Sequence, residues 1–194
     1  MKKKFILIFV ILFAFLCSAC AIPTEEKSVV HSSGLWPYYT FEEACEIADL
    51  IIVGTVKSVD KTYLVPMIEN ANPKRPSNYI ALTDLTITVE KTLKGVEQKE
   101  IKYIQEGGET RETVYVCDDV YELKKGERAL LFLSADGFVI TSECVKPVDA
   151  YDKISVDSTF FPGKSEDARS VMTKVDVDEY ADLISTYLSS QSAG

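Results

Sequence analysis

The chain has 194 residues, of which 21 are basic, 30 are acidic and one is histidine. The formal net charge of −9 argues against a nucleic-acid-binding function, because binding to phosphate depends on clustered Lys and Arg side chains. The length is sufficient for one domain with its own hydrophobic core.

The N-terminus has the layout of a secretory signal peptide, which we place at residues 1–19. Lys2 to Lys4 form a positive start, residues 5–16 are an unbroken apolar segment, and small residues follow. The apolar segment is shorter than the roughly 20 residues that a spanning helix requires, so a permanent transmembrane helix is the less favoured interpretation.

The end of this segment resembles the lipobox of bacterial lipoproteins, in which a cysteine after small residues is acylated and becomes the mature N-terminus. Ser18, Ala19 and Cys20 fit that pattern, and Cys17 departs from it where Leu is usual. The resemblance implies an extracytoplasmic protein anchored to the lipid bilayer by Cys20. The alternative is ordinary cleavage near Ala19 or Ala21, which would give a fully secreted protein. The mature chain keeps 18 basic and all 30 acidic residues, a net charge of −12.

Residues 20–38 show no sustained periodicity of apolar residues and are expected to be a tether. Docking of Trp36 on the domain is left open. A short amphipathic helix is predicted at 41–48. Thr40 and Glu43 have the spacing of a capping box at its start.

A run of strands is predicted from Leu50 onward, where Gly54 indicates a bulge or bend. Residues 61–79 contain three prolines and are expected to form a long loop. Asp136 and Gly137 predict a tight hairpin turn. The expected strands cover residues 50–60, 81–94, 100–105, 112–117, 129–134 and 138–145.

Beyond Pro147 the pattern weakens, and residues 148–175 are expected to be irregular. An amphipathic helix is predicted at 178–189, with Asp176 as its cap. The predicted fold is mainly β. It is a five- to six-stranded antiparallel barrel, because closure removes exposed strand edges, with the first helix at one barrel end and the last helix packed outside.

Residues 45–54 resemble the passage from helix to first strand in netrin-like domains, which include the tissue inhibitors of metalloproteinases. Three later features resemble the same domains: the strand that ends at Lys94-Gly95, the position of Cys117, and the hairpin that ends at Cys144. The resemblance implies an OB-type barrel over residues 39–147. The segment 148–194 would then add an irregular stretch and a helix packed on that barrel.

The inhibitors chelate the protease zinc with a Cys-x-Cys at their free N-terminus, and this sequence lacks that motif. The resemblance places Cys117 and Cys144 close together, each normally bonded to an N-terminal cysteine. With those partners missing, we expect a Cys117–Cys144 disulfide, which would close a loop and stabilise the domain by about 3 kcal/mol, and a buried free thiol at Cys45.

No residue pattern indicates catalysis, a metal or a cofactor. His31, the only histidine, lies in the expected tether, so histidine-based nucleophile systems and zinc sites are disfavoured. The glycines in residues 105–109 indicate a turn and not a phosphate loop. Asp118-Asp119 and residues 176–179 lack the spacing of a calcium loop.

Tyrosines offer the other candidate contacts. If exposed, they would stack sugars or peptides, whereas filling the barrel core and rim is the favoured interpretation. Those on or near the predicted barrel are Tyr63, Tyr79, Tyr103, Tyr115 and Tyr121.

The sequence therefore predicts a non-enzymatic binding module on an anchored lipoprotein, with a protein or glycan ligand and no nucleic acid. One alternative is a protease inhibitor acting through the loop 61–79. Another is an enzyme of an unrecognised kind, which would show a polar pocket with perturbed titratable groups.

Overall fold

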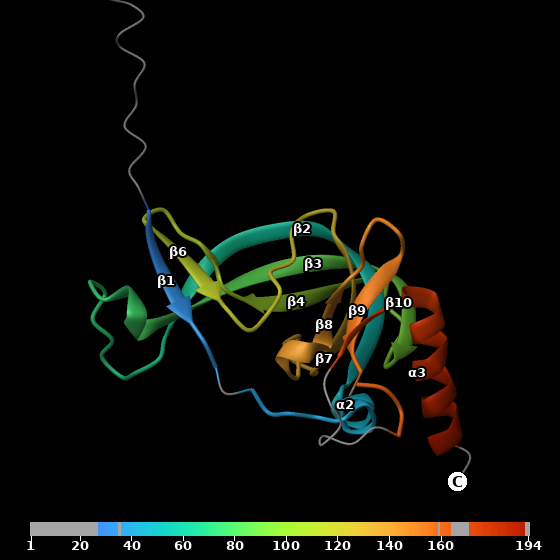
Figure 1. Cartoon of the computed structure of the whole chain (residues 1–194). Coiled ribbons are helices and arrows are strands. Elements are labelled where there is room, and N and C mark those ends of the chain that lie inside the picture. Colours follow the sequence, from blue (N-terminus) through green and yellow to red (C-terminus); the bar gives the residue numbers. More distant parts are fainter. Residues whose placement is uncertain (1–26, 35, 159, 164–170, 193–194) are drawn as a thin grey trace, which may run out of the picture.

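The computed structural model describes residues 27–34, 36–158, 160–163 and 171–192 (Figure 1). Within these residues the chain is mainly β, with ten strands in three sheets and two α-helices. This confirms the expected fold class at the level of a mainly β domain that ends in a helix. None of the helices in the described part has both the length and the apolar character needed to span a bilayer.

The largest sheet has five antiparallel strands in the order β4-β3-β2-β7-β8. These are β2 (Leu50–Pro66), β3 (Tyr79–Lys94), β4 (Glu100–Glu106), β7 (Arg128–Leu133) and β8 (Val145–Pro147). Figure 1 shows β2 and β3 as long, curved strands. Within the described residues β4 and β8 form the two edges and do not pair with each other, so the expected closed barrel is not formed.

The bend in β2 has a local cause at Gly54. The register with β3 shifts between Val53 and Gly54. A Cβ atom at Gly54 would lie 2.7 Å from the Thr88 carbonyl oxygen, so only glycine permits this approach of the two backbones. The bulge predicted at Gly54 is confirmed.

A second sheet has the order β1-β6-β5, with β1 (Ser28–Ser32) parallel to β6 (Thr113–Cys117) and β5 (Gly108–Glu109) antiparallel to it. The expectation that residues 20–38 form a tether is therefore wrong for residues 28–32. Most of β1 is exposed, so it has no apolar alternation by which the sequence would indicate a strand.

The third sheet pairs β9 (Lys153–Asp157) with β10 (Met172–Asp176), in the region expected to be irregular. Ile154 and Val156 are buried and attach this hairpin to the core. The expected strand 138–145 is also corrected. The turn at Gly137 forms as predicted, but the chain then makes one bridge and a short 3-10 helix before it reaches β8.

The loop between β2 and β3 is shorter than expected, because β2 continues to Pro66 and β3 begins at Tyr79. Thr62 lies buried in this extension and holds β2 against β3 through a hydrogen bond of 2.8 Å to Thr83 Oγ1. The residues left outside the strands are 67–78, and they contain the 3-10 helix η2 (Pro76–Asn78).

The two helices have the predicted caps. α2 (Phe41–Ile47) begins with a complete capping box between Thr40 and Glu43. α3 (Val177–Ser192) is preceded by Asp176, whose carboxylate accepts hydrogen bonds from the backbone N–H groups of Asp178 and Glu179.

The core consists of two clusters on the two faces of the five-stranded sheet, because successive strand residues point to opposite sides. The first cluster contains Ile51 and Val53 and is covered by α2, α3 and β9. The second contains Ile52 and Val56 and is covered by the segment 117–123. Trp36 packs against the second cluster.

Candidate binding groove

The cysteines expected to form a site are not brought together by the fold. Cys20 lies outside the described residues. Cys45, Cys117 and Cys144 are buried free thiols, and no disulfide joins them. Cys144 belongs to the first core cluster and Cys117 to the second, so the sheet separates them. A disulfide requires Cα atoms within about 7 Å of each other.

A groove with largely apolar walls lies between the chain that follows β1 and the loop end of the β2–β3 hairpin. Its volume is about 510 Å³, within the usual range for small-ligand sites. Its apolar lining comes from Val30, Trp36, Pro37, Met67, Tyr79 and Ile80. Its floor contains Glu106 at the end of β4 and Cys117 at the end of β6.

The wall that carries Trp36 is fixed by side chains from other elements. His31 Nδ1 and Asp118 Oδ1 are 2.9 Å apart, and the backbone N–H of Gly34 donates to Asp119 Oδ2 at 3.0 Å. Thr141 Oγ1 donates to the Pro37 carbonyl oxygen at 2.8 Å. His31 and the two aspartates therefore hold β1 and its extension in place.

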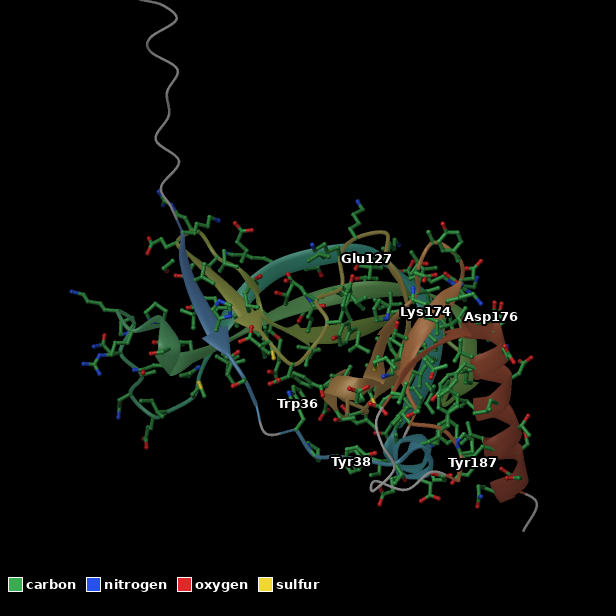
Figure 2. All side chains as sticks on the ribbon, viewed as in Figure 1. Trp36, Tyr38, Glu127, Lys174, Asp176 and Tyr187 are labelled. Carbon is green, nitrogen blue, oxygen red and sulfur yellow. The ribbon has the colours of Figure 1, made fainter. Side chains whose placement is uncertain are left out.

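Trp36 has an unsatisfied donor at this wall. Figure 2 shows the side chain on the segment that joins β1 to α2. Its Nε1 atom is buried and has no hydrogen-bond partner within the described part of the chain. An unsatisfied buried donor costs about 1–3 kcal/mol.

Glu106 supplies the negative charge of the groove. Among the described residues its carboxylate has one hydrogen-bond partner, Cys117 Sγ at 3.8 Å, a long distance for such a contact. No cationic side chain among the described residues forms an ion pair with it. The carboxylate is therefore open to pairing with a ligand.

A second hollow of about 460 Å³ adjoins the groove and shares Glu106 and Cys117 with it. Asp118, Asp119 and Glu122 also line this hollow. Neither hollow has a Lys or Arg side chain in its lining. The two hollows together form a concave surface that is apolar on one side and acidic on the other.

Tyr103 lies near the wall that the two hollows share. Its side chain is fully buried, and its hydroxyl has no hydrogen-bond partner among the described residues. Burial raises the pKa of Tyr103, and the neighbouring Glu106 and Cys117 raise it further. The hydroxyl is a second unsatisfied donor in the same region.

The β2–β3 hairpin continues the apolar side of the groove onto the protein surface. Its exposed apolar side chains include Leu64, Val65, Met67, Ile68 and Ile80. Met67 and Ile80 also line the groove, so the two surfaces are continuous. Contiguous exposed apolar surface of this kind is typical of interaction sites.

The candidate tyrosines have different positions. Tyr103 and Tyr115 are buried, as the core interpretation predicted, whereas Tyr63 and Tyr121 are exposed. Tyr79 lines the groove. Within the described ranges no three His, Cys, Asp or Glu side chains are placed to share a metal ion.

Sequence reasoning did not identify the groove. Trp36 was left open as a residue that docks on the domain, and its status as the only tryptophan was the available signal. Glu106 had no signal, because nothing in the sequence distinguishes it from the other 29 acidic residues. No protein-family model matches the chain, and a search of curated proteins finds no significant match.

Proposed function

We propose that the chain is a membrane-anchored extracytoplasmic lipoprotein whose folded part is a non-enzymatic binding module. The observation that carries the binding role is the groove beside Trp36. There an apolar wall that includes Trp36 and a carboxylate without an ion-pair partner, that of Glu106, come together. Concave apolar surface with a few convergent polar groups is the usual form of a binding site.

The anchor in this proposal is Cys20, as the lipobox resemblance implies. Seven positions separate Cys20 from Lys27, where the described residues begin. An extended chain covers about 3.5 Å per residue, so the linker reaches roughly 25 Å at most. The module would therefore act close to the membrane surface, and β1 would be its membrane-proximal strand.

We also propose that the curved sheet is a variant of the netrin-like OB fold. The capped helix α2 leads directly into the bulged strand β2, and β2, β3 and β4 follow as a meander. The turn at Gly137 lies against β4, where the Ile104 N–H donates to the Gly137 carbonyl oxygen at 2.8 Å. This contact supports an arrangement close to barrel closure.

The experiment that tests the binding role is site-specific photo-crosslinking of the full-length protein on living cells. A photoreactive amino acid replaces Met67, which lines the groove and is 59% exposed. The control position is Val96, which is 75% exposed on the turn between β3 and β4. We expect a discrete adduct from position 67 and none from position 96. The same adducts from both positions, or none from either, would reject the groove as the binding site.

A second candidate function is protease inhibition through the hairpin, favoured by the exposed apolar side chains of Met67 and Ile68. It predicts that the mature protein inhibits a secreted metalloprotease at a one-to-one ratio. It also predicts that Met67→Ser with Ile68→Ser abolishes the inhibition. Full activity of a panel of secreted metalloproteases at saturating protein would exclude this candidate.

A further inference from the structure

We propose that the groove and the adjoining acidic hollow form one site for a polypeptide segment in which a Lys or Arg lies beside an apolar side chain. This inference rests on the proposed function, because it assigns the ligand chemistry of the same groove. It adds that the ligand is positively charged, that Glu106 pairs with this charge and that the ligand is a polypeptide.

The charge assignment follows from the lining of the two hollows. Glu106 belongs to both, and it has no cationic partner among the described residues. Asp118 and Asp119 are occupied by His31 and the Gly34 N–H. They still add negative potential beside Glu106. Since no Lys or Arg lines either hollow, a cationic side chain meets attraction there and an anionic one meets repulsion.

The apolar requirement follows from the other half of the site. Trp36, Met67, Tyr79 and Ile80 line a volume of about 510 Å³, which accommodates an aromatic or branched side chain. The indole of Trp36 is also a favourable surface for a cation, because the face of the ring carries negative potential. A purely polar cation would leave this half of the site in contact with water.

One feature favours a polypeptide over a small amine. The groove is bordered by β1, which lies at the end of the sheet order β1-β6-β5 and so leaves one edge unpaired in the described sheet. Extended peptides bind at such edges by adding a strand.

The test uses the detergent-solubilised mature lipoprotein and the intrinsic fluorescence of Trp36, which is the only tryptophan of the chain. The probes are three blocked heptapeptides with a central Phe between two Lys, two Gln or two Glu residues, together with spermidine. We expect the Lys peptide to change the Trp36 emission and to bind about tenfold more tightly than the Gln peptide. The Glu peptide is expected not to bind.

Two variants assign the charge effect to one carboxylate. Glu106→Gln should remove the preference for Lys over Gln by weakening the binding of the Lys peptide about tenfold. Glu97→Gln, which makes the same change at an exposed position outside both hollows, should leave all affinities unchanged. Circular dichroism spectra that match those of the parent protein show that both variants are folded.

Several results would overturn the inference. Equal binding of the three peptides would reject the charge assignment, and spermidine that binds as tightly as the Lys peptide would reject the polypeptide. A position-67 adduct on cells combined with no binding of any probe would reject this ligand class and keep the proposed function. Loss of both the adduct and the peptide binding would reject both proposals.

Discussion

At the residue scale, two glycines explain how the chain leaves β4 and enters a different sheet. Gly107 has a positive φ and separates β4 from β5, which begins at Gly108 and pairs with β6. The Gly108 backbone lies against the buried hydroxyls of Thr62 and Thr83, which are 2.8 Å apart. Thr83 Oγ1 donates to the Gly107 carbonyl oxygen, and the Glu109 N–H donates to Thr62 Oγ1. The turn predicted at these glycines is therefore corrected to a passage between two sheets, where the backbone must reach two buried hydroxyls.

We predict that Gly108→Ala destabilises the domain by about 3 kcal/mol. The residue has a φ of +127°, and a Cβ atom would approach Thr62 Oγ1 to 2.5 Å. The matched control is Gly126→Ala, at φ +86° with no atom within 4 Å of the new Cβ, which should cost only about 1 kcal/mol. Urea unfolding of both variants measures the difference. Equal losses would show that the contact with the threonines is not the cause.

The buried thiol of Cys45 makes stability fall at alkaline pH. Burial raises its pKa to about 12, whereas an unfolded thiol titrates near pH 8.5 to 9. Above pH 9 the unfolded chain has lost this proton and the folded chain retains it. The associated stability is therefore complete below about pH 9 and is lost as the pH rises toward 12.

We predict that the free energy of unfolding falls by up to about 2.5 kcal/mol more between pH 7 and pH 11 in the parent protein than in Cys45→Ala. Urea titrations of both proteins at pH 7, 9 and 11 give the two slopes. Groups distant from Cys45 cancel in the comparison, whereas the pKa values of Cys144, Tyr180 and Tyr187 are raised in part by Cys45 and so belong to the measured difference. Parallel curves would mean that Cys45 is ionised or oxidised in the folded state.

At the element scale, the sequence predicts what depends on neighbours in the chain. The cap of α2, the bulge at Gly54 and the turn at Gly137 are all set by local residues, and each forms as predicted. Local sequence patterns do not predict the strands β1 and β9, because these residues become strands by pairing with segments that are distant in the sequence. β1 pairs with residues 113–117. In β9 the alternation of apolar and polar side chains covers only five residues, which is too short to indicate a strand among the surrounding polar residues.

The start of α3 offers a test of a locally encoded element. Asp176 accepts hydrogen bonds from Asp178 and Glu179, so Asp176→Ala leaves two backbone N–H groups without this partner. We expect a loss of about 1 kcal/mol in thermal or urea unfolding. Asp176→Asn keeps the capping oxygen and should retain most of the stability. If the Asn variant lost as much as the Ala variant, the charge of Asp176 and not its cap would be responsible.

At the scale of the whole molecule, the candidate site is a product of the tertiary fold. Trp36, Met67 and Glu106 come from three different segments, and successive members of this set are about 30 to 40 positions apart in sequence. Local patterns give no information on such an assembly, so the ligand surface was not predictable from the sequence. What the sequence does show is a net charge of −9, which agrees in sign with an acidic binding surface.

The proposed anchor gives the final prediction. We expect Cys20→Ser to prevent acylation and release the protein from the membrane, because membrane retention depends on the acyl chains, each buried CH₂ of which contributes about 0.8 kcal/mol. Cys17→Ser is the matched control, since it changes the other cysteine of the segment and should leave the anchor intact. Cell fractionation, with the mass of the N-terminal peptide under non-reducing conditions, measures both effects.

A Cys20→Ser protein that stays in the membrane fraction would show that residues 1–19 are retained as the anchor. An unacylated Cys20 in disulfide linkage to Cys117 or Cys144 would instead place the N-terminus on the domain and make protease inhibition the leading function.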